Sequence, residues 1–199
     1  ASTEVLPAVL ADTLRDLSFP KQMKWDATLD DGRGELMFGR PIRWILFLFG
    51  GQVVPFEIGR TTSAESIDVA VIQSSNFTYG HRFLGERAGE PVKVKSLADY
   101  QAKLAKRFVV LDHTERRQKI QTALLAKAEE HGGSVDFASP TLSALLNEVS
   151  DLVECPLVVE GRFDETFLEL PREVLTTTMM HHQHFFPLAG PEHGLLPVF

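Results

Sequence analysis

The chain has 199 residues, 44% of them hydrophobic and 24% charged, and its formal net charge at pH 7 is −7. This composition is ordinary for a globular protein, and the acidic balance excludes the uniformly basic surface of a general nucleic-acid coat protein. With Cys155 as the only cysteine, no disulfide within the chain, a longest apolar run of only Trp44–Phe49 and no secretory leader, we expect a cytoplasmic protein without a membrane span.

The first forty residues read as a helix followed by polar turns. Apolar residues at helical spacing predict a helix over residues 3–17, which Phe19-Pro20 ends. The polar stretch LDDGRG at 29–34 is typical of a turn. We therefore predict a helical lead-in over residues 1–38, followed by a central domain over residues 39–199.

The next part of the chain mixes short apolar runs with glycine and proline. Pro41 is expected to open a second helix over 42–49, which Gly50-Gly51 would end. Strands are predicted over 52–58 and 67–72, and a loop over 76–89.

From residue 92 onward, predicted strands and helices follow one another closely. The predicted strands are 92–95, 108–111, 157–160, 185–188 and 195–199, and the predicted helices are 97–107, 112 or 114 to 131, 141–149 and 171–183. This pattern predicts one compact α/β domain of the α+β kind, with a mixed β-sheet and packed helices.

Charge is distributed unevenly along the chain. Residues 103–119 hold six basic and two acidic side chains, a balance of +4, whereas residues 129–173 hold eleven acidic and two basic ones, a balance of −9. In the basic stretch, Arg116, Arg117 and Lys119 lie near the start of a predicted helix, where they are candidates for contact with RNA phosphates. A solvated amphipathic helix face is the alternative interpretation.

Two further short strings are candidates for RNA contact. Arg40 and Arg43 precede Trp44, and guanidinium planes beside an aromatic ring suit phosphate contact and base stacking; the alternative is that both arginines pair with carboxylates while Trp44 fills the core. His81 and Arg82 lie on a predicted loop, where His81 could anchor the loop, contact RNA or act as an acid or base.

The histidines His181, His182 and His184 resemble a metal site at first. His181 and His184 are three residues apart on a predicted helix and could converge, but His182 points well away from His181. Zinc needs three or four convergent ligands, so we predict no metal site in this chain. His81 has no visible catalytic partner in the sequence, so we also predict no catalytic residue.

Many short strings, in this order and spacing, carry a resemblance that covers essentially the whole chain. They are Phe19-Pro20-Lys21, Met23-Lys24-Trp25, Arg40-Pro41-Ile42-Arg43-Trp44, Gly80-His81-Arg82-Phe83, Asp112, Glu115-Arg116, Leu146-Asn147-Glu148-Val149, Leu152-Val153-Glu154, Pro156, Phe163-Asp164, Leu168, Leu170-Pro171, Glu173-Val174-Leu175, Met180, Gln183 and Phe186-Pro187. Together they resemble the beta subunit of bacterial glycyl-tRNA synthetase. The chain departs from that pattern at His184-Phe185, where Lys-Tyr is usual, and at Cys155, where an aromatic residue is common.

The resemblance implies a fold and a set of partners. The region is similar to the editing-type domain of the phenylalanyl-tRNA synthetase beta subunit. The implied partners are a glycyl-tRNA synthetase alpha subunit, tRNA(Gly) and a second beta subunit in a heterotetramer. In this family the alpha subunit uses ATP and Mg to activate glycine, so no cofactor is expected here.

We therefore expect a piece of a longer polypeptide that supports the charging of tRNA(Gly) by binding tRNA or contacting the alpha subunit, inactive on its own. Two alternatives stay open. One is a hydrolytic editing domain for mischarged tRNA, with His81 as its candidate polar group. The other is a purely structural scaffold at a subunit interface.

Overall fold

The computed structural model describes residues 3–60, 71–191 and 194–199. It is a mixed α/β structure, as predicted, and its contacts divide the chain into two compact units, residues 1–107 (unit 1) and 108–199 (unit 2). The position between residues 38 and 39, which the sequence suggested as a boundary, lies inside unit 1. No helix among the described residues is long and apolar enough to cross a membrane.

Unit 1 begins with helix α1, Leu6–Asp16, which confirms the predicted first helix with a later start. Pro7 lies in its first turn, where a missing N–H costs little. The helix buries Ala11 in a core formed with side chains from both sides of position 38. The buried members of this core are Ala11, Trp25, Ala27, Leu29, Leu36, Ile58 and Ile72.

A four-stranded mixed sheet holds this core, with the strand order β1-β5-β6-β2. Its strands are β1 (Ala27–Thr28), β5 (Glu57–Arg60), β6 (Ile72–Ser75) and β2 (Ile45–Leu46). β5 runs antiparallel to both β1 and β6, whereas β2 runs parallel to β6. Most of the predicted strand over 67–72 lies outside the described residues, and β6 begins at its end.

The predicted helix over 42–49 is wrong. Its residues form strand β2 and strand β3, Leu48–Phe49, and β3 turns back into β4, Gln52–Val53, as a hairpin. Gly50 and Gly51 make the two-residue turn with positive φ angles of 57° and 80°, a conformation that glycine adopts without steric cost. The predicted strand over 52–58 is divided between β4 and β5.

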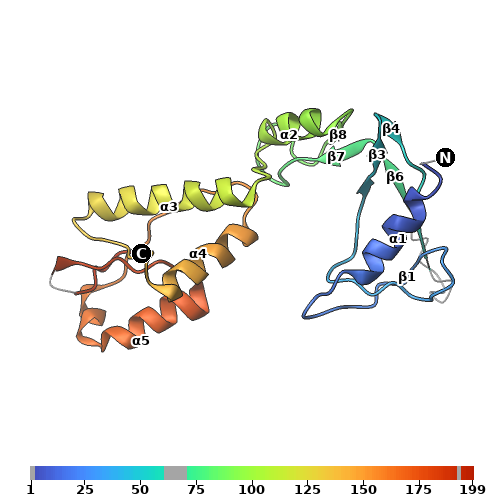
Figure 1. The fold of residues 1–199 in the computed structure, drawn as a ribbon. Coiled ribbons are helices and arrows are strands. Elements are labelled where there is room, and N and C mark those ends of the chain that lie inside the picture. The colour runs from blue at the N-terminus through green and yellow to red at the C-terminus, as the bar shows by residue number, and fades with distance from the viewer. Residues whose placement is uncertain (1–2, 61–70, 192–193) are drawn as a thin grey trace. The chain divides into compact units, whose positions relative to one another are not determined.

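A second hairpin pairs β7, Phe77–Tyr79, with β8, Pro91–Lys93, in an antiparallel ladder. β7 lies in the segment predicted to be a loop, so that prediction is wrong over three residues. Helix α2, Leu97–Ala105, follows β8, and the Lys103 ammonium donates a hydrogen bond of 2.7 Å to the Lys93 carbonyl. Figure 1 shows α2 beside this hairpin.

Unit 2 is built around two long helices, α3 (His113–Glu130) and α4 (Pro140–Leu152). Asp112 caps α3 by accepting a hydrogen bond from the Glu115 N–H, as a Ser, Thr or Asp N-cap does. Their facing apolar stripes form one core with Phe186. Its buried members are Ile120, Leu124, Leu145, Leu146 and Phe186, and a neighbouring cluster holds Ala128, Val135, Leu188 and Val198.

The rest of unit 2 is less regular than the sequence suggested. The predicted helix over 171–183 is present as α5, Arg172–Thr177, continued by a π-helical turn, η2 (Thr178–His182), and a 3₁₀ turn, η1 (Glu165–Glu169), precedes it. The four predicted strands over 108–111, 157–160, 185–188 and 195–199 are not strands. Isolated bridges, including Arg162 with Val198, tie the extended segments together instead.

Candidate nucleic-acid interface

The hairpin of β7 and β8 has one buried face and one exposed face. Phe77 pairs with Lys93, Thr78 with Val92, and Tyr79 with Pro91. Because side chains alternate along a strand, Phe77, Tyr79, Pro91 and Lys93 share one face and Thr78 and Val92 share the other. Thr78 and Val92 are buried, whereas Phe77 is 41% exposed. The hairpin therefore presents aromatic rings and a lysine to the outside.

Trp44, just before β2, adds a third ring to this face. Its ring centroid lies 4.6 Å from that of Tyr79, with the planes at 61°, an edge-to-face contact. Trp44 is nevertheless 43% exposed. With Ser75, Phe77, Tyr79 and Pro91, it lines an open hollow of about 270 Å³. We call the surface formed by Trp44, Phe77, Tyr79, Pro91 and Lys93 the aromatic face.

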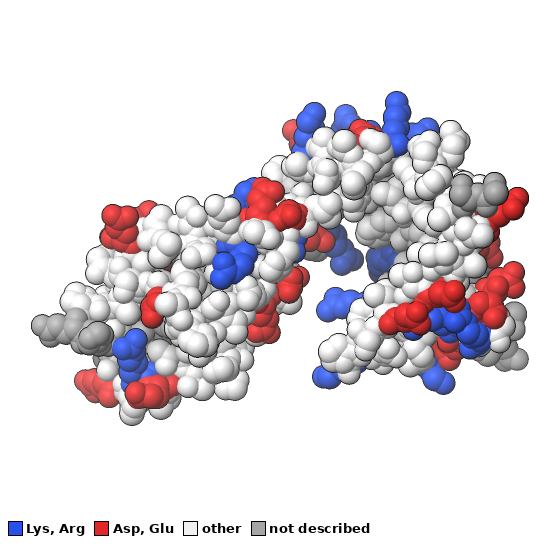
Figure 2. All heavy atoms as spheres, in the orientation of Figure 1, with Lys and Arg blue, Asp and Glu red and all other residues white. Residues whose placement is uncertain are grey.

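The part of the chain that contains most of the aromatic face is rich in basic side chains. Between residues 71 and 107 there are seven Lys and Arg and three Asp and Glu, a balance of +4 within a chain of net charge −7. Figure 2 shows Lys and Arg side chains gathered over α2 and the β7–β8 hairpin. Lys93 and Lys106 make no ion pair with any described residue. Such unpaired cations remain available to a phosphate chain.

Arg40 and Arg43, two of the sequence candidates, lie in the segment that leads into Trp44. Both are exposed, and neither makes an ion pair with a residue that the structure describes. They do not start a helix, but Arg43 is the direct neighbour of an aromatic-face residue. Trp44 does not fill the core, contrary to the alternative interpretation of this string.

His81 and Arg82 follow Tyr79 in unit 1. The Nδ1 atom of His81 accepts hydrogen bonds from the backbone N–H groups of Phe83 and Leu84, at 3.2 and 3.1 Å. The backbone N–H of His81 donates to the Arg107 carbonyl at 2.8 Å. These contacts favour the loop-anchoring interpretation. Arg82 is exposed, with its guanidinium carbon 5.6 Å from the centroid of the Phe83 ring.

The other three candidates lie on α3 in unit 2. Arg116 donates to the carbonyls of Ser150, Val110 and Leu111 at 2.8 to 2.9 Å, and its side chain is only 15% exposed. Arg117 donates to Asn147 and Gln121, and Lys119 pairs with Glu115 at 2.8 Å. RNA contact by Arg116, Arg117 and Lys119 stays a prediction, and these bonds favour a role in the fold.

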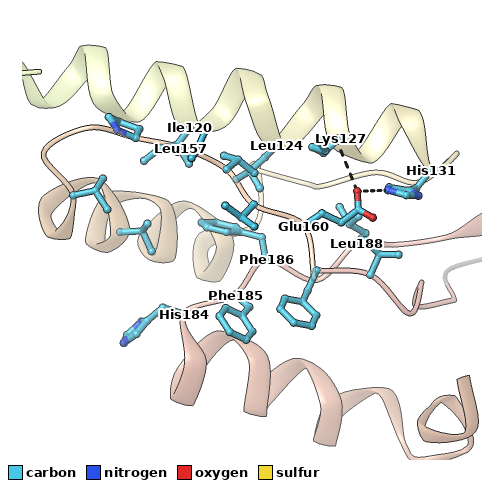
Figure 3. Close-up of a pocket in the computed structure, with 17 residues that line it drawn as sticks. Ile120, Leu124, Lys127, His131, Leu157, Glu160, His184, Phe185, Phe186 and Leu188 are labelled. Atoms are coloured by element: carbon cyan, nitrogen blue, oxygen red, sulfur yellow. Dashed lines mark hydrogen bonds and ion pairs between the residues drawn. The ribbon is translucent and has the colours of Figure 1, made fainter. Parts of the chain in front are cut away.

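Unit 2 contains a largely apolar cavity of about 190 Å³ between α3, α4 and the extended segments 156–160 and 184–188 (Figure 3). Ile120, Leu124 and Phe186 form part of its wall. None of the described residues that line it is Ser, Thr or Cys, the residue types that supply hydroxyl or thiol nucleophiles. Since unit 2 alone lines this cavity, His81 does not belong to it, and hydrolytic editing stays a prediction.

One end of that cavity carries a cluster of charged side chains around Glu160. The His131 Nε2 atom lies 2.9 Å from Glu160 Oε2, and the Lys127 ammonium lies 3.9 Å from the same oxygen (Figure 3). Arg162 donates to the other oxygen, Oε1, at 3.1 Å. The hydrogen bonds from His131 and then Arg162 lower the pKa of Glu160 below its ordinary value. The carboxylate is thus stabilised in its charged form by its own neighbours.

Histidines His181, His182 and His184 end the α5–η2 segment. His181 and His182 are exposed, and His184 Nδ1 lies 3.7 Å from a carboxylate oxygen of Glu148. Within the described ranges, no group of three or more His, Cys, Asp or Glu side chains is arranged to hold a metal ion.

The sequence prediction missed four members of the aromatic face, Phe77, Tyr79, Pro91 and Lys93, because β7 was assigned to a loop and its pairing with β8 was not predicted. A signal was present: the alternation Phe-Thr-Tyr is typical of a half-buried strand, and a second short run, Pro-Val-Lys, follows after a glycine-rich stretch.

Comparison with known proteins places the chain in a family. The family model described as "Glycyl-tRNA synthetase beta subunit" matches residues 1–199. The glycine–tRNA ligase beta subunits of Clostridioides difficile and Moorella thermoacetica are 39% and 40% identical to it, over 100% and 98% of this chain. That of Bacillus subtilis is 37% identical over 99% of the chain.

The matched region makes up 25% of each of these three relatives, so the chain spans about a quarter of their length. Both the family model and the relatives cover both structural units. The chain therefore belongs to the glycyl-tRNA synthetase beta subunit family.

Proposed function

We propose that this chain is a non-catalytic part of a glycine–tRNA ligase beta subunit and that unit 1 contacts tRNA during the charging of tRNA(Gly). The observation that carries the proposal is the aromatic face beside unpaired cations in an otherwise acidic chain. Aromatic rings and Arg or Lys side chains together are the usual surface for RNA, since they meet bases and phosphates respectively.

Attraction between cations and phosphates is expected to contribute most of the affinity for tRNA. Arg43 and Lys93 lie next to or within the aromatic face, and neither is neutralised by a carboxylate of the described chain. Each phosphate that such a cation contacts releases counterions and makes binding depend on salt. The acidic stretch 129–173 in unit 2 would repel the same backbone.

The wider setting follows from the family. We propose that the polypeptide works in the cytoplasm with an alpha subunit, which uses ATP and Mg to activate glycine, and with a second beta subunit in a heterotetramer. The chain itself then needs no cofactor.

The test is tRNA(Gly) binding and charging by the full-length polypeptide, assembled with the alpha subunit, carrying Arg43→Ala and Lys93→Ala together. Each phosphate contact contributes about 0.7 to 0.9 to the steepness of log affinity plotted against log salt concentration. Losing two contacts should therefore make this slope shallower by about 1.5. Arg162→Ala, an exposed cation of unit 2 paired with Glu160, is the matched control. An unchanged slope in the double variant would remove unit 1 from the RNA contact.

A second role, contact with the alpha subunit, is favoured by apolar side chains exposed on unit 2. Leu157 is 84% exposed, Val159 75% and Leu152 67%. Large apolar side chains at such exposure mark interaction surfaces when they cluster. Leu157→Asp should weaken capture of the alpha subunit by the full-length polypeptide and leave tRNA affinity unchanged; equal capture by parent and variant would exclude this surface.

A further inference from the structure

We propose that the aromatic face binds unpaired RNA bases by stacking, so that unit 1 selects single-stranded over duplex segments of its RNA. This inference rests on the proposed function and adds to it the class of nucleotide that is bound. It concerns Trp44, Phe77 and Tyr79, whereas the salt-dependent contact concerns the cations around them.

The rings are exposed enough to meet a base. Trp44 and Phe77 are 43% and 41% exposed, although both are large apolar side chains that would stabilise the fold if buried. In an edge-to-face pair such as Trp44 and Tyr79, only one ring has a face covered by the other. The pair therefore holds Trp44 in place while leaving ring surface for a ligand.

The hollow beside these rings has a suitable size and composition. Its volume of about 270 Å³ is bounded by Trp44, Phe77, Tyr79, Pro91 and the polar Ser75. Aromatic walls offer stacking to any base. The Ser75 hydroxyl accepts from the Phe77 N–H at 3.2 Å and donates to the Ile45 carbonyl at 3.5 Å, which leaves one lone pair to accept from a base edge. A duplex cannot use such a site, because each paired base is already stacked between its neighbours and its edges face its partner.

Charge indicates RNA as the occupant. Lys93 lies directly opposite Phe77 in the β7–β8 pair, and Arg43 is the residue before Trp44. A cation is thus next to two of the three rings. Phosphates on either side of a stacked base need such partners. An aromatic hollow with a proline in its wall also suits a proline-rich peptide, but that ligand gains nothing from the excess of positive charge.

The experiment compares Trp44→Ala and Phe77→Ala with the parent in the full-length polypeptide, using a single-stranded RNA decamer and a duplex of the same sequence. Since stacking on one aromatic ring contributes about 1–3 kcal/mol per base, each variant should bind the single strand roughly 10-fold more weakly. Duplex affinity should change less than about two-fold. Trp44→Phe should restore most of the single-strand affinity, because it keeps an aromatic ring.

Phe167→Ala is the matched control, since Phe167 is an aromatic residue of unit 2 that is 51% exposed. Circular dichroism of each variant checks folding, and Phe77→Ala carries the test if Trp44→Ala does not fold. Equal losses on single strand and duplex, no loss on either, or binding of a polyproline decamer in place of RNA would each overturn the inference. If the parent binds no tRNA at all, it is the proposed function that fails.

Discussion

The guanidinium of Arg15 donates two hydrogen bonds to the carboxylate of Asp31 and forms a bidentate ion pair with it. Arg15 Nε lies 3.0 Å from Oδ2 and its terminal nitrogen 2.9 Å from Oδ1, and both side chains are mostly shielded, at 13% and 11% exposure. Arg15 also donates to the carbonyls of Gly34 and Glu35. One arginine on α1 thus fixes the polar turn that closes the core of unit 1.

This pair makes the stability of unit 1 depend on pH. The hydrogen bond from Arg15 lowers the pKa of Asp31, so its stabilisation is complete above the unfolded-state value of about 4 and is lost as pH falls below it toward the folded-state pKa. Asp31→Asn should lower the free energy of unfolding by about 1–2 kcal/mol at pH 7. Measured by urea denaturation, the difference from the parent should shrink below pH 4.

Asp30→Asn is the control, because Asp30 is the exposed neighbour of Asp31 in the same turn. A loss of stability equal in both variants, or one in Asp31→Asn that stays constant down to pH 2, would contradict the role assigned to the pair.

Arg116 is expected to matter for stability before it matters for RNA. Its guanidinium satisfies three backbone carbonyls, so Arg116→Ala should lower the free energy of unfolding of unit 2 by about 2–3 kcal/mol. Lys119→Ala removes only an exposed pair with Glu115 and should cost less than about 1 kcal/mol. A structural role for Arg116 would be contradicted if Arg116→Ala kept the stability of the parent but made tRNA binding less dependent on salt concentration.

Gly80 lies against the end of α2 with no room for a side chain. A Cβ at this position would stand 2.3 Å from the Arg107 Cβ and 3.0 Å from the Arg107 carbonyl oxygen. Gly80→Ala should therefore cost about 1–3 kcal/mol in thermal denaturation, because backbone and side chain must both shift. Gly89→Ala, where the φ of 79° brings strain but nothing lies within 4 Å, should cost about 1 kcal/mol. Equal costs would argue against the close contact.

His81 should hold the loop after β7 through its Nδ1 atom, which accepts two backbone hydrogen bonds. His81→Ala removes the partner of the Phe83 and Leu84 N–H groups, so hydrogen exchange of these two amides should become about 10-fold faster. His81→Asn should restore most of the protection, since the Asn side-chain oxygen reaches a position similar to Nδ1. If His81→Asn exchanged as fast as His81→Ala, some other property of the histidine would be responsible.

Elements with local signals could be predicted from the sequence. Ser96 and Asp112 stand three residues before the Asp99 and Glu115 N–H groups that they cap, and α2 and α3 begin where these residues indicate. In the segment 42–49 the local signals misled: Pro41 and Gly50-Gly51 suggested the start and end of a helix. A short apolar run fits a buried helix or a strand, and the partner strand β6 lies about thirty residues away. The pairing of β2 with this distant strand is what makes the segment a strand and not a helix.

The candidate site shows the same division. Arg40, Arg43 and Trp44 could be proposed from residue type, because charge and ring chemistry do not depend on the fold. Phe77 and Lys93 could not be joined to them, since only the register of β7 and β8 puts these two opposite each other. In unit 2, the carbonyls that hold Arg116 come from α4 and from the turn before α3, a relationship that spacing along the sequence does not express.

The hydrophobic clusters described in units 1 and 2 draw on separate stretches of sequence. The buried cluster of unit 1 ends at Ile72, and those of unit 2 begin at Ile120. Each half thus carries its own source of cooperativity, and scanning calorimetry should resolve two melting transitions rather than one. A damaging substitution in either half would then shift one transition alone, and no single melting temperature would describe the polypeptide.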